Sequence, residues 1–149
     1  MEAIIFIGLQ GSGKSSLYRH RFFRTHVRIN LDMLRTRHRE SGLIEACLRL
    51  KQPFVVDNTN ATVAERAIYI TAAKEAAFRV IGFYFESRTA ACLERNALRS
   101  EDEQVPRVGI LGTAKRLELP TYPEGFDEIQ YVRLNGGNEF QLEAWRDEL

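Results

Sequence analysis

The clearest chemical signal in the chain is the run GLQGSGKS, from Gly8 to Ser15. Its spacing matches the pattern G-x-x-x-x-G-K-[ST], in which glycines let backbone N–H groups surround phosphate oxygens. In this pattern Lys14 reaches the terminal phosphates of a nucleotide, and the Ser15 hydroxyl binds Mg²⁺. A short apolar run precedes the motif and a helical pattern follows it, which is the context that a phosphate-binding loop requires.

The motif predicts ATP and Mg²⁺ as cofactors. The side chains and amides expected to bind ATP are those of Gly8, Gln10, Gly11, Ser12, Gly13, Lys14, Ser15 and Ser16. A dinucleotide fold is excluded, because the fingerprint G-x-G-x-x-G would need a glycine where Ser16 stands.

A single acid, Asp32, lies in the most basic part of the chain. Residues 19–39 contain seven arginines, all three histidines and only this carboxylate. One interpretation is that Asp32 accepts the proton of an attacking hydroxyl, as an aspartate does in kinases. The other is that it caps the helix that follows. Arg35 follows three residues later, so it either binds an anionic group of the substrate or pairs with Asp32.

A second acid, Asp57, ends the apolar run FVVD and begins the polar stretch DNTNAT. Proteins with a phosphate loop often hold Mg²⁺ through such an acid, so Asp57 is a candidate metal ligand beside Ser15. Asn58 and Asn60 are candidates for hydrogen bonds to the substrate, although turn-forming residues of this kind also brace their own loop.

Two arginines four residues apart, Arg95 and Arg99, lie on one face of a predicted helix in CLERNALRSEDE. On a mobile lid at about 95–107 they would neutralise charge on a transferring phosphoryl group. Alternatively, they pair with neighbouring acids on a solvated helix face.

The elements that must position these residues alternate between strands and helices. Strands are predicted at 3–7, 27–30, 54–57, 80–85 and 129–134, with helices at 14–24, 32–39, 42–51, 62–77, 89–99, about 107–117 and 139–148. This alternation predicts an α/β fold, a three-layer αβα P-loop NTPase with a five-stranded parallel sheet and a helical lid. All the candidate segments then meet at the carboxyl edge of the sheet.

Length and composition predict one domain over residues 1–149 in a reducing compartment. The segment 19–39 carries +6 and the whole chain +1, which leaves about −5 elsewhere and excludes a uniformly basic protein. Cys47 and Cys92 match no zinc or redox motif, and no run is long enough for a signal peptide or a membrane span. We therefore expect a cytoplasmic protein without a membrane partner.

Taken in order, GLQGSGKSS, INLDMLR, VVDNTNATVAERAIYITAAK, ERNALR and VPRVGILGTAKRLELPTYPEGFDEI resemble the kinase domain of the polynucleotide 5′-hydroxyl kinase family. The resemblance implies an enzyme of nucleic acid repair that phosphorylates 5′-hydroxyl ends of DNA or RNA with ATP and Mg²⁺. It implies that Asp32 is the general base and that Arg35 contacts the substrate's phosphate. It also implies that Arg99 lies on the ATP phosphates, with Arg95 supporting it.

Two other functions fit the same motifs. Related P-loop kinases phosphorylate small hydroxyl compounds such as metabolites or antibiotics, and the near-neutral net charge of this chain favours such an acceptor. A non-catalytic module that binds nucleotide as a switch would also use the phosphate loop.

Overall fold

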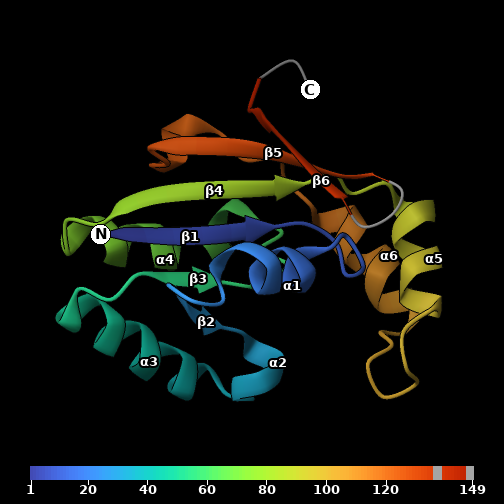
Figure 1. Ribbon diagram of the computed structural model, residues 1–149, viewed down its shortest axis with the longest axis horizontal. Helices are drawn as coiled ribbons and strands as arrows, with labels where there is room; N and C mark the ends of the chain where they lie inside the picture. The colour runs from blue at the N-terminus through green and yellow to red at the C-terminus, as the bar shows by residue number, and fades with distance from the viewer. Residues whose placement is uncertain (136–138, 147–149) are drawn as a thin grey trace.

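The computed structural model describes residues 1–135 and 139–146, and within them six strands form one sheet (Figure 1). The strands are β1 (Glu2–Ile7), β2 (Val27–Ile29), β3 (Phe54–Val56), β4 (Arg79–Phe85), β5 (Glu128–Asn135) and β6 (Glu139–Ala144). They lie in the order β2-β3-β1-β4-β5-β6. The first five are parallel, as the alternation of strands and helices predicts.

The sixth strand corrects the prediction of a C-terminal helix at 139–148. β6 pairs antiparallel with β5, so the sheet is mixed and has six strands where five were predicted. Phe140 and Leu142, two residues apart, pack against the core, which is the alternation of a strand rather than a helix. The last two residues of the predicted helix lie outside the described residues.

Helices cover both faces of the sheet, which confirms the three-layer architecture. Helix α1 (Lys14–Leu17) and the π-helix η1 (Tyr18–Phe22) lie on one face, while α3 (Arg37–Leu50) and α4 (Val63–Glu75) lie on the other. Helices α5 (Thr89–Ala97) and α6 (Arg107–Arg116) stand beyond the carboxyl ends of the strands (Figure 1). Two short segments, α2 (Leu31–Leu34) and η2 (Tyr122–Glu124), complete the fold. No helix in the described ranges is both long and apolar enough to span a bilayer.

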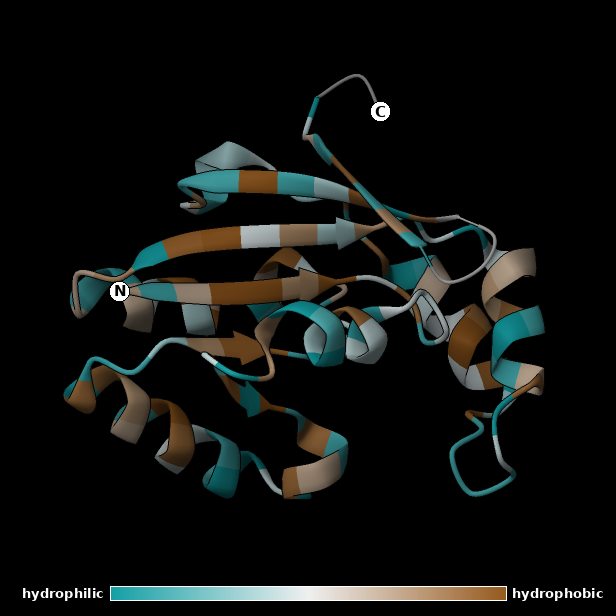
Figure 2. Cartoon of the chain, viewed as in Figure 1, coloured by the Kyte–Doolittle hydropathy of each residue, from teal (hydrophilic) through white to brown (hydrophobic). Residues whose placement is uncertain are grey.

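The central strands carry apolar residues that are buried on both faces of the sheet. The brown segments along these strands in Figure 2 mark their hydrophobic residues. In β1, Ile5 and Ile7 face α3 and α4, while Ile4 and Phe6 face α1 and η1. Burial on both sides is what parallel sheets require. It fixes the strand ends in space, so that the loops following β1, β2 and β3 meet along one edge.

Helix boundaries follow local signals. The Thr62 hydroxyl accepts a hydrogen bond from the Glu65 amide at 3.2 Å, and the Glu65 carboxylate accepts one from the Ala61 amide at 3.1 Å. Helix α4 therefore begins where the T-x-x-E pattern predicts it. Pro106 immediately precedes α6, which also begins as predicted.

Candidate active site

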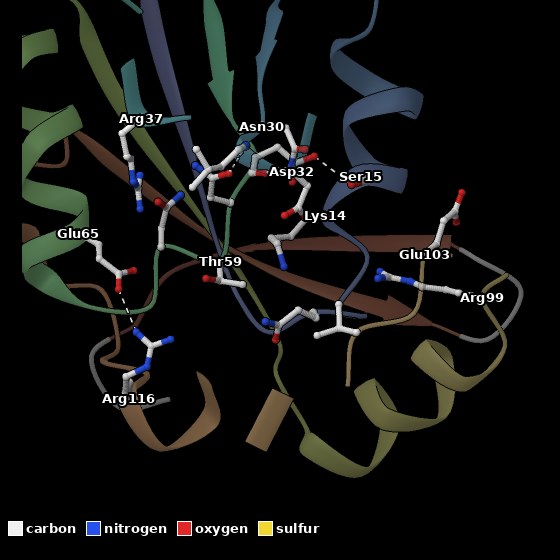
Figure 3. A pocket seen from close by; sticks show the side chains of 16 residues that line it. Lys14, Ser15, Asn30, Asp32, Arg37, Thr59, Glu65, Arg99, Glu103 and Arg116 are labelled. Atoms are coloured by element: carbon white, nitrogen blue, oxygen red, sulfur yellow. Dashed lines mark hydrogen bonds and ion pairs between the residues drawn. The ribbon is translucent and has the colours of Figure 1, made fainter. Parts of the chain in front are cut away.

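A cavity of about 400 Å³ lies at the carboxyl edge of the sheet. Its walls come from the loops after β1, β2 and β3, from α4, and from the segment that joins α5 to α6. Figure 3 shows Lys14, Ser15 and Asp32 between Arg99 on one side and Arg37 and Arg116 on the other. The lining residues are Gln10, Lys14, Ser15, Asn30, Leu31, Asp32, Arg37, Asp57, Asn58, Thr59, Asn60, Glu65, Arg99, Glu103, Val105 and Arg116.

The phosphate loop has the backbone that its glycines predict. Gly11 and Gly13 adopt φ angles of 79° and 102°, values that side chains other than glycine rarely tolerate. A Cβ atom on Gly11 would also lie 2.6 Å from the carbonyl oxygen of Cys92. The Ser12 hydroxyl and the side-chain oxygen Oε1 of Gln10 are buried without a hydrogen-bond partner among the described residues. Buried polar atoms without partners are uncommon, so a polar ligand is the natural partner for this loop.

Lys14 is held within the loop by its own backbone. Its Nζ donates to the carbonyl oxygens of Gly8 at 2.9 Å and Leu9 at 2.7 Å. Desolvation by burial is the largest influence on the ammonium group and lowers its pKa to about 8. Arg99 lowers the pKa further, while Asp57 and Asp32 oppose the shift. An anionic ligand would relieve this desolvation cost.

We expect nucleotide binding to take up a proton at pH 8 to 9. Free Lys14, with a pKa near 8, is partly neutral there, whereas phosphate oxygens would hold it charged in the complex. Below pH 7 the Lys14 amine is already protonated in the nucleotide-free protein, so its contribution to proton uptake disappears. Calorimetric titration of ADP in two buffers of different ionisation enthalpy measures this uptake. A Lys14→Arg variant is the control and should show none, because arginine stays charged.

Ser15 and Asp57 lie together, as a shared metal site requires. The Ser15 hydroxyl donates to Asp57 Oδ2 at 3.0 Å, and Arg28 Nε donates to the same oxygen at 2.9 Å. Asp57 Oδ1 is buried and has no partner among the described residues. Residues 1–135 and 139–146 contain no cluster of three acidic, histidine or cysteine ligands. One hydroxyl and one carboxylate, completed by phosphate oxygens and water, nevertheless fit Mg²⁺, which seldom uses an all-protein site.

Asp32 lines the cavity and does not cap a helix. The residue that caps α2 is Asn30, whose side-chain oxygen accepts from the Met33 amide at 3.0 Å. The capping interpretation of Asp32 is therefore wrong. Its carboxylate lies in the first turn of α2 and forms no hydrogen bond or ion pair within the part of the chain that the structure describes. It is thus available to a hydroxyl group.

Arg35 lies just outside α2, so it does not share a helical face with Asp32. Its φ of 75° ends α2 at Leu34, and Arg35 does not line the cavity. The arginine of this segment that does line it is Arg37, which sequence reasoning missed. Arg37 Nη1 donates to the buried Glu40 carboxylate at 3.0 Å and to the Tyr69 hydroxyl at 2.9 Å. The seven arginines therefore do not form one basic face at the site.

The two asparagines brace the site. Asn58 accepts a hydrogen bond from the Leu31 amide at 2.9 Å and donates one to Glu40 at 3.0 Å. The Asn60 amide nitrogen donates to the carbonyl oxygens of Phe6 at 2.7 Å and Val56 at 3.4 Å. Both residues line the cavity, yet these contacts favour the bracing role over hydrogen bonding to a substrate.

The two lid arginines differ in their surroundings. Arg95 donates through Nε to the carbonyl oxygen of Gly11 and through Nη2 to the Cys92 sulfur at 3.7 Å, so it supports the phosphate loop. Arg99 lies just beyond α5 and lines the cavity. Asn96 and Val105 close the base of the segment between α5 and α6 with hydrogen bonds of 2.7 and 2.9 Å. The segment 98–106 falls within the range 95–107 that was predicted as a lid, and its role as a lid stays a prediction.

Comparison with known proteins identifies a family and two relatives. A family model described as an AAA domain matches residues 4–120. A bifunctional polynucleotide phosphatase/kinase of Schizosaccharomyces pombe is 26% identical over 135 residues, covering 88% of this chain and 33% of its own length. A putative protein of the same name from Acanthamoeba polyphaga mimivirus is 31% identical over 138 residues, with the same two coverages. The chain therefore spans about a third of the length of the curated relatives it matches.

Among solved structures, Chaetomium thermophilum Kti12 in complex with ADP-AlF3 superposes with a TM-score of 0.70 at 18% identity, covering 89% of each chain. At this identity the likeness concerns the fold alone. Because the AAA domain model covers most of the chain and its phosphate loop is intact, the protein belongs to this AAA domain family and is a P-loop domain similar to a part of two bifunctional polynucleotide phosphatase/kinases.

Proposed function

We propose that this domain transfers the γ-phosphoryl group of ATP to a 5′-hydroxyl end of DNA or RNA. The observation that carries the proposal is the Asp32 carboxylate, unpaired within the described chain, in the same cavity as Lys14 and Arg99. A binding module has no need for such a carboxylate beside its phosphate site. The names of the two curated relatives support a polynucleotide acceptor.

The phosphate loop would hold ATP through its backbone amides, with Lys14 exchanging its two carbonyl partners for phosphate oxygens. Mg²⁺, when bound through Ser15 and Asp57, would neutralise charge on those oxygens. Arg99 would approach the transferring group from the lid side of the cavity. These groups stabilise charge, which is the main requirement of phosphoryl transfer.

Asp32 would accept a hydrogen bond from the acceptor hydroxyl and orient it toward the γ-phosphorus. The hydroxyl oxygen forms the new bond as the bond from phosphorus to the leaving ADP oxygen breaks, and the proton passes to Asp32. Because this transition state is loose, the proton leaves late, and orientation contributes more than base strength.

The far side of the cavity would hold the acceptor. Arg37 and Arg116 line it, and Arg116 is paired with Glu65 at 3.1 Å. Two guanidinium groups around the hydroxyl position suit an acceptor that carries phosphates of its own. Arg35, the phosphate contact that the family resemblance implies, would need the acceptor to extend beyond the cavity rim.

A panel of 5′-hydroxyl DNA and RNA oligonucleotides, single-stranded, nicked and overhanging, tests the proposal. With ATP and Mg²⁺ we expect 5′-phosphorylated product, and the Michaelis constant of the oligonucleotide should rise with salt. ATP turnover stimulated by a small hydroxyl compound and insensitive to oligonucleotides would indicate the small-molecule kinase instead. ATP binding without transfer to any acceptor would indicate the switch module.

A further inference from the structure

We propose that Arg28 is an internal counter-cation that takes the place of Mg²⁺ beside Asp57 when nucleotide is absent, and that binding of metal and nucleotide displaces it. This inference rests on the nucleotide-binding part of the proposed function and is independent of the acceptor. Arg28 lies in β2, within the basic segment 19–39, and no role was predicted for it from the sequence.

The guanidinium contacts both side chains that would bind the metal. Its Nε lies 2.9 Å from Asp57 Oδ2 and its Nη2 lies 3.0 Å from the Ser15 hydroxyl oxygen. The Ser15 hydroxyl in turn donates to Asp57 at 3.0 Å. A lone pair of Ser15 and one carboxylate oxygen are thus already occupied by a positive charge. A divalent cation at these oxygens would lie within a few ångströms of the guanidinium and repel it.

Burial explains why a counter-cation is needed. The Asp57 side chain is fully buried, and a buried carboxylate without a partner is strongly destabilising. Arg28 supplies the missing charge in the free protein. The other carboxylate oxygen, Oδ1, is buried without a partner in the described residues, so the ion pair leaves half of the carboxylate unsatisfied. That oxygen gives a metal a first point of contact.

The surroundings of Arg28 allow it to leave. Its side chain is 28% exposed, whereas that of Asp57 has no exposure. The guanidinium carbon lies 6.0 Å from the centre of the Tyr18 ring, so an aromatic face flanks one side of it. Rotation about the flexible stem takes the charge to solvent without disturbing β2, whose backbone pairs with β3.

Metal and nucleotide binding by Arg28→Gln tests the idea. We expect nucleotide-free Arg28→Gln to bind Mn²⁺, measured from the EPR signal of the free ion, about tenfold more tightly than the unaltered protein. Metal-free ADP should bind more weakly to the variant, because Asp57 then repels the phosphates uncompensated. General damage to the site would weaken both affinities, so opposite changes distinguish the two explanations.

Three controls keep the test decisive. Arg24→Gln removes an exposed charge from the same segment and should leave both affinities unchanged. Asp57→Asn added to Arg28→Gln should abolish the gain in Mn²⁺ affinity, which locates the metal at Asp57. Arg28→Lys keeps a charge, so its Mn²⁺ affinity should fall between those of Arg28→Gln and the unaltered protein. It replaces the glutamine variant in the test if that variant does not fold. The proposal is overturned if Arg28→Gln binds Mn²⁺ with the same affinity as the unaltered protein. If the glutamine variant does not fold, the same comparison is made with Arg28→Lys. Neither result depends on whether any acceptor is phosphorylated.

Discussion

Asp32→Asn is expected to lower the rate of phosphoryl transfer by about a thousandfold while leaving ATP affinity unchanged. The amide keeps the shape of the side chain but orients the acceptor hydroxyl poorly and takes up no proton. Asn30, not Asp32, caps α2, so the substitution leaves the local fold intact. Single-turnover rates with a 5′-hydroxyl oligonucleotide and equilibrium titration with an ATP analogue measure the two effects.

Asp102→Asn is the matched control, because it removes an exposed carboxylate of the lid segment that does not line the cavity. Its transfer rate should match that of the unaltered protein. An Asp32→Asn variant that transfers phosphate at an undiminished rate would disprove the assignment of Asp32 as the base.

Arg99→Gln is expected to lower the transfer rate by about a thousandfold or more with little change in thermal stability. Arginines that neutralise the transferring phosphoryl group commonly contribute this much. Within the cavity, Arg99 makes no side-chain hydrogen bond or ion pair to the described residues, so the fold does not depend on it.

Arg95→Gln provides the contrast, since its guanidinium supports Gly11 and Cys92 from outside the cavity. It should weaken ATP binding and lower the melting temperature, because the phosphate loop loses a half-buried support. Melting curves with and without ADP, set beside transfer rates, separate the two variants. If both variants lost stability equally and kept their rates, the division of roles between the two arginines would be wrong.

The sequence predicted the parts of the site that depend on short-range patterns. The phosphate loop is continuous in the chain, and buried parallel strands place Asp32 and Asp57 at the same edge as Lys14. Both the phosphate loop and the placement of the two acids can be predicted without knowing which distant side chains contact one another. The functional roles of these residues remain predictions that the variants above test.

Contacts between side chains from distant segments could not be predicted from short-range sequence patterns. The pairing of Arg28 with Asp57 joins residues 29 positions apart, and a strand arginine in a basic run gives no sign of its partner. Arg37 lines the cavity where Arg35 was expected, because α2 ends at Leu34. The chain turns there through a positive φ at Arg35, which the local sequence does not demand. The strand β6 is different, since Phe140 and Leu142 alternate in the sequence itself, although a helix was predicted over 139–148.

The Asn60 amide has a consequence for the thermodynamics of nucleotide binding. By bridging Phe6 and Val56 it ties together the ends of β1 and β3, between which the phosphate loop leaves the sheet. The Gly8 amide adds a bond to the carbonyl oxygen of Thr59 at 3.0 Å. The floor of the cavity is therefore ordered during folding, and ligand binding does not have to meet that entropy cost again. The phosphate site is preorganised, so any ordering that accompanies ATP binding should fall on the 98–106 segment rather than on the sheet.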